Sequence, residues 1–147
     1  MKDVFARAHH VCIVVADVRA AIDYYEGIGI GGWQDYPDLS EYDNKELSVP
    51  DRKAFLGLKY VYTNVVAGLQ LQLVEPGPGD TPQRNFLDRT GGGVFHIGFN
   101  VEDIDKSTGT VQEAGISILM SGRRKDRTGF TYFDTAVQAG VVLEIRH

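Results

Sequence analysis

The stretch that decides the fold is HVCIVVADVRAAIDYYEGIGI, at His10–Ile30, because a related stretch, HIGFNVEDIDKSTGTVQEAGI, occupies His96–Ile116. The two align when the first is shifted by 86 positions, from 10 to 96. Each begins with an apolar run and continues with an aspartate, Asp17 or Asp103. Such an aspartate suits a helix N-cap, because its side-chain oxygen accepts from the first free amides. Each stretch therefore predicts a strand followed by a capped helix.

The two halves also end alike. Gly29 and Gly115 suit the left-handed position just past a helix end. Each half then closes on a similar strand, GLQLQLVEP at 68–76 and GVVLEIRH at 140–147. These strands are 72 positions apart rather than 86, so the first half carries an insertion of 14 residues. A repeat half a domain long is typical of a duplicated module and not of a solenoid.

We therefore expect a single α+β domain over residues 1–147, built from two βαβββ modules that form a curled mixed sheet around a cleft. The modules span about 8–76 and 94–147, with a linker at 77–93. Residues 37–57 lack periodicity, and a loop this long is typical of a lid or a mobile segment. The predicted strands are 8–15, 32–36, 58–66, 69–75, 94–101, 116–120, 130–134 and 140–146, and the predicted helices are 18–28, about 83–92 and 103–114.

Composition narrows the classes of function. A chain of 147 residues buries a core without cross-links, and its one cysteine, Cys12, excludes an internal disulfide and fits a reducing compartment. The net charge of −5, without an extended basic surface, argues against nucleic acid. The sequence shows no signal peptide and no apolar membrane span. We expect a cytoplasmic protein that binds neither nucleic acid nor membranes.

Strand periodicity sorts the polar residues by face. Neighbouring side chains of a strand point to opposite faces, so His10 shares a face with Cys12 and Val14, whereas His9 falls with the apolar row on the core side. Three other predicted strands repeat this design, with an apolar row on one face and polar residues on the other. The polar face then carries, strand by strand, His10, Gln70 or Gln72, His96 and Glu144.

These residues have the chemistry of a metal site. Two imidazoles, one carboxylate and one amide oxygen form a mixed nitrogen and oxygen set that suits a borderline divalent ion. Their repeat-equivalent positions allow them to converge when the sheet curls. An antiparallel sheet also commonly carries polar residues on a solvated face. The pattern by itself therefore fits either a metal site or an exposed surface.

At these residues the chain resembles the vicinal oxygen chelate superfamily, which includes glyoxalase I, methylmalonyl-CoA epimerase, extradiol dioxygenases and fosfomycin-resistance proteins. The resemblance covers nearly the whole chain. It rests on HHVCIVVADV with YYEGIGI, LQLQLVEP, GGGVFHIGFNVEDID with QEAGI, and GVVLEI, in this order. It implies one divalent metal ion (zinc, cobalt, nickel or manganese) in a cleft of the sheet, and a homodimer.

Within the superfamily the chain looks most like the methylmalonyl-CoA epimerase group. That resemblance assigns the metal ligands to His10, Gln72, His96 and Glu144, with Gln72 chosen because it lies four residues before the proline of LVEP. Glyoxalase I usually carries a glutamate in the place of Gln72. The epimerases also have a glutamate proposed as a second base, and the matching position here falls at about Phe55.

The resemblance implies a divalent-metal-dependent isomerase or epimerase that acts on a small acyl thioester or 2-oxo compound through a metal-stabilised enolate, with Glu144 as the catalytic base. One alternative is a glyoxalase I-like lyase. An alternative of another class is a metal-free small-molecule binding or resistance protein, against which the complete ligand set argues. A dioxygenase would require redox-active iron.

A basic run, SGRRKDRTG, lies between two predicted strands of the second half. Such a run is typical of an exposed loop, but guanidinium groups also bind phosphates and carboxylates. Arg123 and Arg124 are therefore the candidate anchors for a small anionic substrate.

Overall fold

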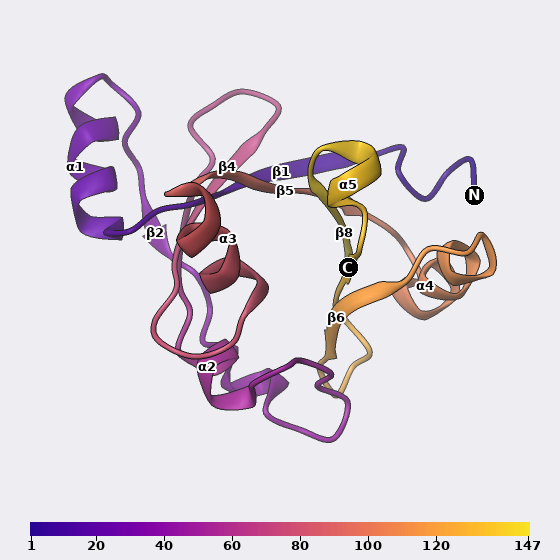
Figure 1. Ribbon diagram of the computed structural model, residues 1–147. Coiled ribbons are helices and arrows are strands. Elements are labelled where there is room, and N and C mark those ends of the chain that lie inside the picture. The colour runs from indigo at the N-terminus through magenta and orange to yellow at the C-terminus, as the bar shows by residue number, and fades with distance from the viewer.

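One mixed sheet of eight strands is the framework of the protein. The computed structural model describes residues 1–147, and its strands lie in the order β2-β3-β4-β1-β5-β8-β7-β6 (Figure 1). The predicted α+β class with a curled mixed sheet is confirmed. The strands are β1 (Ala8–Val14), β2 (Gln34–Asp35), β3 (Lys59–Thr63), β4 (Gln70–Glu75), β5 (Gly93–Asn100), β6 (Ile118–Arg123), β7 (Gly129–Phe133) and β8 (Val142–Arg146).

The two halves of the sheet have the same strand order. In each half the first strand lies at the centre, and the fourth, third and second follow outward. The central strands β1 and β5 pair antiparallel, while β4 pairs parallel with β1 and β8 parallel with β5. The four strands that carry the predicted polar face are therefore neighbours at the centre of the sheet.

The two repeat-related helices begin as predicted. α1 (Val18–Gly27) and α4 (Ile104–Glu113) are each capped by the preceding aspartate. Asp17 accepts from the Ala20 amide and Asp103 from the Lys106 amide, both at 3.0 Å. α3 (Pro82–Thr90) matches the predicted short helix. α5 (Ala136–Ala139) was not predicted, because a single turn carries no helical periodicity.

The long segment 37–57 covers the open side of the curved sheet (Figure 1). It contains a 3₁₀ turn, η1 (Leu39–Tyr42), and the short helix α2 (Arg52–Leu56). Ser48 forms an isolated bridge with Ser121 of β6, and Asn44 donates to the carbonyl of Arg123 at 2.9 Å. The segment thus joins the first half of the protein to the far edge of the second.

Both faces of the sheet are covered. α4 lies over β7 and β8, and α1 lies over β4, with separate apolar clusters beneath them. The opposite face holds the largest cluster, which includes Cys12, Val14 and Val142 with Tyr42 and Phe55 of the long segment. The polar row lies on this second face and is buried, which excludes the alternative of a solvated surface. The longest helices have ten residues, too few to span a bilayer.

A glycine makes room for the polar row. Across the three central strands, His10 of β1 faces Gly98 of β5, and Gly98 faces Glu144 of β8. Gly98 has no side chain, so the His10 ring lies over its backbone and reaches toward Glu144. A Cβ atom at position 98 would collide with the His10 ring.

Replacing Gly98 with alanine should therefore displace the His10 ring. We expect the free energy of unfolding to fall by about 1–3 kcal/mol, as is typical of overpacking a filled site. Gly109→Ala in α4 is the matched control, since a Cβ there meets nothing within 4 Å and alanine should stabilise the helix by about 0.5–1 kcal/mol. Urea unfolding measures both, and unchanged stability of Gly98→Ala would contradict the close approach.

Candidate metal centre

Three buried donor atoms converge at the centre of the sheet. His10 Nε2 lies 2.8 Å from His96 Nε2 and 2.8 Å from Glu144 Oε2, and His96 Nε2 lies 3.1 Å from the same carboxylate oxygen. The residues belong to β1, β5 and β8, and they are 1%, 0% and 5% exposed. The structure thus brings together three of the four predicted ligands, which lie up to 134 positions apart (10 to 144).

The spacing of these atoms fits a divalent ion. Metal–nitrogen and metal–oxygen bonds of about 2.1 Å at right angles place neighbouring ligand atoms about 3.0 Å apart. The three separations of 2.8 to 3.1 Å match one face of such a coordination shell. Glu144 Oε2 is buried and has no polar partner in the protein other than the His10 and His96 imidazoles. Its lone pairs are therefore left for a cation at the common centre.

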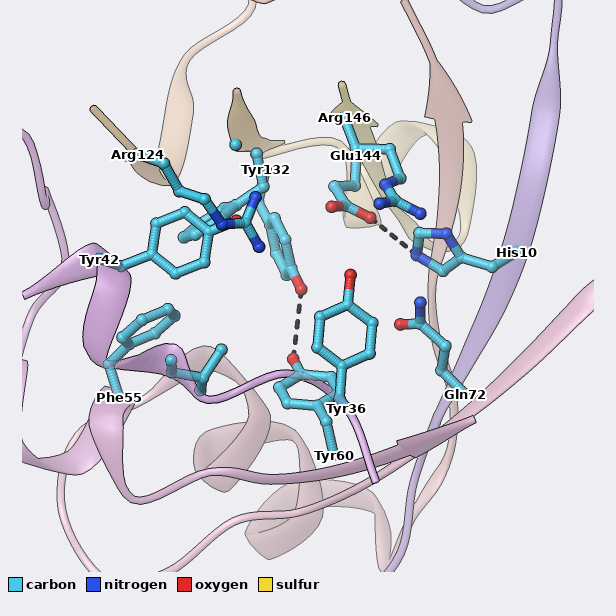
Figure 2. A pocket seen from close by; sticks show the side chains of 13 residues that line it. His10, Tyr36, Tyr42, Phe55, Tyr60, Gln72, Arg124, Tyr132, Glu144 and Arg146 are labelled. Atoms are coloured by element: carbon cyan, nitrogen blue, oxygen red, sulfur yellow. Dashed lines mark hydrogen bonds and ion pairs between the residues drawn. The ribbon is translucent and has the colours of Figure 1, made fainter. Parts of the chain in front are cut away.

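Gln72, the fourth predicted ligand, lies on the wall of the adjoining pocket. Its strand neighbours β1, its side chain is buried, and Figure 2 shows its amide group beside the His10 imidazole. Its Nε2 atom donates to Gln70 Oε1 at 2.8 Å, so Oε1 is the atom left for the pocket. Gln70, the alternative from periodicity, donates to Asn64 instead and does not line this pocket. The structure thus favours Gln72 over Gln70 as the glutamine of the site.

Aromatic side chains form most of the other pocket wall (Figure 2). The hydroxyls of Tyr60 and Tyr132 lie 3.2 Å apart, and Gln83 donates to the Tyr60 hydroxyl at 2.8 Å. Removal from water raises the pKa of both phenols well above 10, so they stay neutral at physiological pH. Phe55, at the position of the expected second base, lines the same wall and stacks on Phe130.

The two predicted anion anchors, Arg123 and Arg124, lie in different surroundings. Arg123 is the last residue of β6, so its side chain and that of Arg124 point to opposite faces. Arg123 is 6% exposed and lies outside the pocket, where it donates to Asp105 at 2.9 Å and to the Phe130 carbonyl at 2.6 Å. Arg124 lines the pocket, lies over the Tyr42 ring and pairs with Glu41 at 2.7 Å. The structure brings only Arg124 to the site.

His9 does not lie with the apolar row, as strict alternation predicted. The register between β1 and β5 shifts between Ala8 and His10, so His9 is an extra residue in a β-bulge. A bulge re-aims the side chains next to it. The His9 ring lies 2.8 Å from His10 Nδ1 and 3.1 Å from the Arg146 guanidinium.

Arg146, Tyr36 and Tyr42 are among the pocket residues that were not predicted site residues. Arg146 follows Glu144 by two positions, so the alternation that selected Glu144 also placed Arg146 on the same face. Tyr36 is the last residue of the predicted strand 32–36, and Tyr42 reaches the pocket from the segment 37–57, which lacks periodicity. No sequence signal identifies these two tyrosines.

The charge states follow from burial and proximity. Burial acts to raise the pKa of Glu144, but His10 and His96 outweigh it and hold the pKa well below its ordinary range. Burial lowers the pKa of His96. Burial and the Arg146 charge lower the pKa of His9 to about 4. At neutral pH the site therefore holds the Glu144 carboxylate beside an unprotonated His96, and these are the states in which a carboxylate and an imidazole bind a metal.

A comparison with known families finds a match over most of the chain. Residues 9–133 match the profile of the Glyoxalase/Bleomycin resistance protein/Dioxygenase superfamily. An ethylmalonyl-CoA/methylmalonyl-CoA epimerase of Cereibacter sphaeroides is 29% identical over 123 residues, which cover 81% of this chain and 78% of that protein.

Solved structures share the fold. Methylmalonyl-CoA epimerase from Mycobacterium tuberculosis superposes with a TM-score of 0.65 at 19% identity, covering 97% of this chain and 88% of the other. A variant of Streptomyces coelicolor methylmalonyl-CoA epimerase in complex with 2-nitronate-propionyl-CoA superposes with a TM-score of 0.67 at 22% identity, covering 95% of both chains.

Metal content tests the assignment of the ligands. We expect His96→Ala to lose most bound metal, because the imidazole supplies a converging donor atom, while His9→Ala keeps it. Elemental analysis of protein purified without chelator or affinity tag, before and after incubation with cobalt, measures both variants. Equal losses in the two variants would contradict the assignment.

Acid should destabilise the metal-free protein. His96 and Glu144 have folded-state pKa values below their ordinary 6.5 and 4.5. Their stabilising contribution is therefore complete above pH 6.5 and is lost as the pH falls, by up to about 1.4 kcal/mol per pH unit for each group. Urea unfolding in chelator at pH 7, 6 and 5 measures this slope. His96→Gln should reduce the slope to the part that His9 contributes, since the pKa of His9 is lowered as well, and a wild-type profile that is already flat would contradict the shift.

Proposed function

The chain belongs to the Glyoxalase/Bleomycin resistance protein/Dioxygenase superfamily, and we propose that it is a divalent-metal-dependent epimerase acting on an acyl-coenzyme A thioester. The observation that carries this proposal is the convergence of His10, His96 and Glu144 beside a pocket. The epimerase relative from Cereibacter sphaeroides supports the substrate class.

The proposed metal ligands are His10, Gln72, His96 and Glu144. A divalent ion bound there supplies a Lewis acid that stabilises negative charge on substrate oxygens. His10 and His96 are buried, and each presents its Nε2 atom to the centre. This rigid placement means that little reorganisation is needed when charge develops.

Glu144 is the proposed base. It is the one carboxylate on the pocket wall, so it is placed to accept the proton from the carbon next to the thioester carbonyl. The proton that leaves carbon passes to a Glu144 carboxylate oxygen, and the electron pair moves onto the substrate's carbonyl oxygen as an enolate. Return of a proton to the opposite face of that carbon inverts its configuration.

The pocket shapes how that proton returns. Glu144 is the only carboxylate that lines it, and the matching position for a second acid holds Phe55. The groups on the facing wall that carry exchangeable protons are neutral phenols, among them Tyr36, Tyr60 and Tyr132. These phenols and their apolar neighbours also exclude water from the enolate.

Solvent exchange tests the function. We expect the cobalt-loaded protein to incorporate deuterium from D₂O at the α-carbon of methylmalonyl-CoA or ethylmalonyl-CoA, read by mass spectrometry. Glu144→Gln should lower the rate by about 100-fold or more, because it removes the base. Glu113→Gln, an exposed acid on α4, is the matched control and should exchange at the wild-type rate.

Absence of exchange with every acyl-CoA tested would contradict the proposal. Turnover of a glutathione hemithioacetal in its place would assign the protein as a glyoxalase I-like lyase.

A further inference from the structure

Arg146 is the one guanidinium in the pocket without a carboxylate partner. Seven of the nine arginines of the chain form an ion pair with a carboxylate. The two others are Arg89, which is exposed on α3 and lies over the Phe86 ring, and Arg146, which lines the pocket. The other pocket arginine, Arg124, is already paired with Glu41.

The position of Arg146 ties it to the metal centre. It follows Glu144 by two residues on β8, which places both side chains on the same face about 6.6 Å apart along the strand. Figure 2 shows its guanidinium beside Glu144 and His10. A ligand that reaches the converging donor atoms therefore also lies within reach of Arg146.

The bulge in β1 explains how the guanidinium is held. It turns the His9 ring toward Arg146, whose Nη1 atom lies 3.1 Å from both imidazole nitrogens and donates to the one that carries no hydrogen. This contact uses one edge of the guanidinium. The remaining N–H groups form no hydrogen bond with the protein, and their planar arrangement matches the two oxygens of a carboxylate.

Charge favours an anion at this place. A divalent ion outweighs the single negative charge of Glu144 by one unit, and Arg146 adds another positive charge beside it. The loaded pocket therefore carries an excess of positive charge close to the reacting centre. A carboxylate there would offset it.

We propose that Arg146 is a specificity-determining residue that binds a carboxylate of the substrate at the edge of the metal centre, and that His9 is the residue that positions it. The inference rests on the proposed function for the metal centre. It explains why two histidines stand side by side in β1: His10 faces the metal, and His9 holds the guanidinium that selects the substrate.

Malonate binding to the cobalt-loaded protein tests this inference. It is measured by calorimetry at constant ionic strength. We expect Arg146→Gln to weaken malonate binding by about tenfold or more, the loss expected for a charge-assisted contact, with cobalt affinity unchanged. Arg146→Lys should recover part of the affinity, because it restores the charge but not the planar pair of donors.

The matched variants separate positioning from general damage. His9→Ala should weaken malonate binding by less than Arg146→Gln does, without loss of cobalt. Arg89→Gln removes the other arginine that lacks a carboxylate partner and should leave malonate binding at the wild-type value. Thermal unfolding of each variant confirms that it is folded.

Equal malonate affinity in wild type and Arg146→Gln would overturn the inference, and so would cobalt-loaded wild type that binds no malonate. Failure of wild type to bind cobalt would instead refute the metal centre of the proposed function. In that case malonate binding is compared between metal-free wild type and metal-free Arg146→Gln. Weaker binding in Arg146→Gln supports the inference, and equal or undetectable binding in the two proteins overturns it.

Discussion

The antiparallel pairing of β1 with β5 is the constraint on which the site depends. It joins the two halves of the sheet at their first strands and places His10 opposite Gly98, two residues along β5 from His96. The parallel pairing of β8 with β5 then sets Glu144 opposite the same glycine. A side chain at position 98 would separate the histidine from the carboxylate. Three strands and one missing Cβ atom thus create the cluster.

Burial of this cluster has an energetic consequence. A carboxylate and two imidazoles removed from water are unfavourable unless their polar atoms find partners. Glu144 Oε2 and His96 Nδ1 have no hydrogen-bond partners in the protein. Gln83 Oε1 is a third buried polar atom without a hydrogen-bond partner, whereas Arg123 is satisfied by carbonyl and hydroxyl acceptors. A bound cation would remove the cost at the cluster.

Much of the fold was predictable because strand and helix signals are local. The alternation of apolar and polar residues identified the central strands and the face that carries the polar residues. The capping aspartates identified the helices that follow the first strand of each half. The misplacement of His9 and the divergence of Arg123 from Arg124 have another origin. The β-bulge in β1 turns His9 to the other face of the sheet. β6 extends to Arg123, farther than predicted, so Arg123 and Arg124 point to opposite faces. Such shifts depend on pairing with a distant strand and leave no local pattern.

The repeat separates the proposed metal ligands from the residues that we propose select the substrate. A shift of 86 positions relates His10 to His96. A shift of 72 positions relates Gln72 to Glu144 and Tyr60 to Tyr132.

The residues around this cluster do not repeat. By the same shifts, Arg146 corresponds to Val74 and His9 to Phe95, both apolar and buried. Tyr36, Tyr42 and Phe55 lie before the repeat-related final strand, in or next to the long segment of the first half. The proposed metal centre therefore follows the internal symmetry, and the groups around it break that symmetry. A single small substrate has no twofold symmetry to match, so its recognition must come from the residues that differ between the halves.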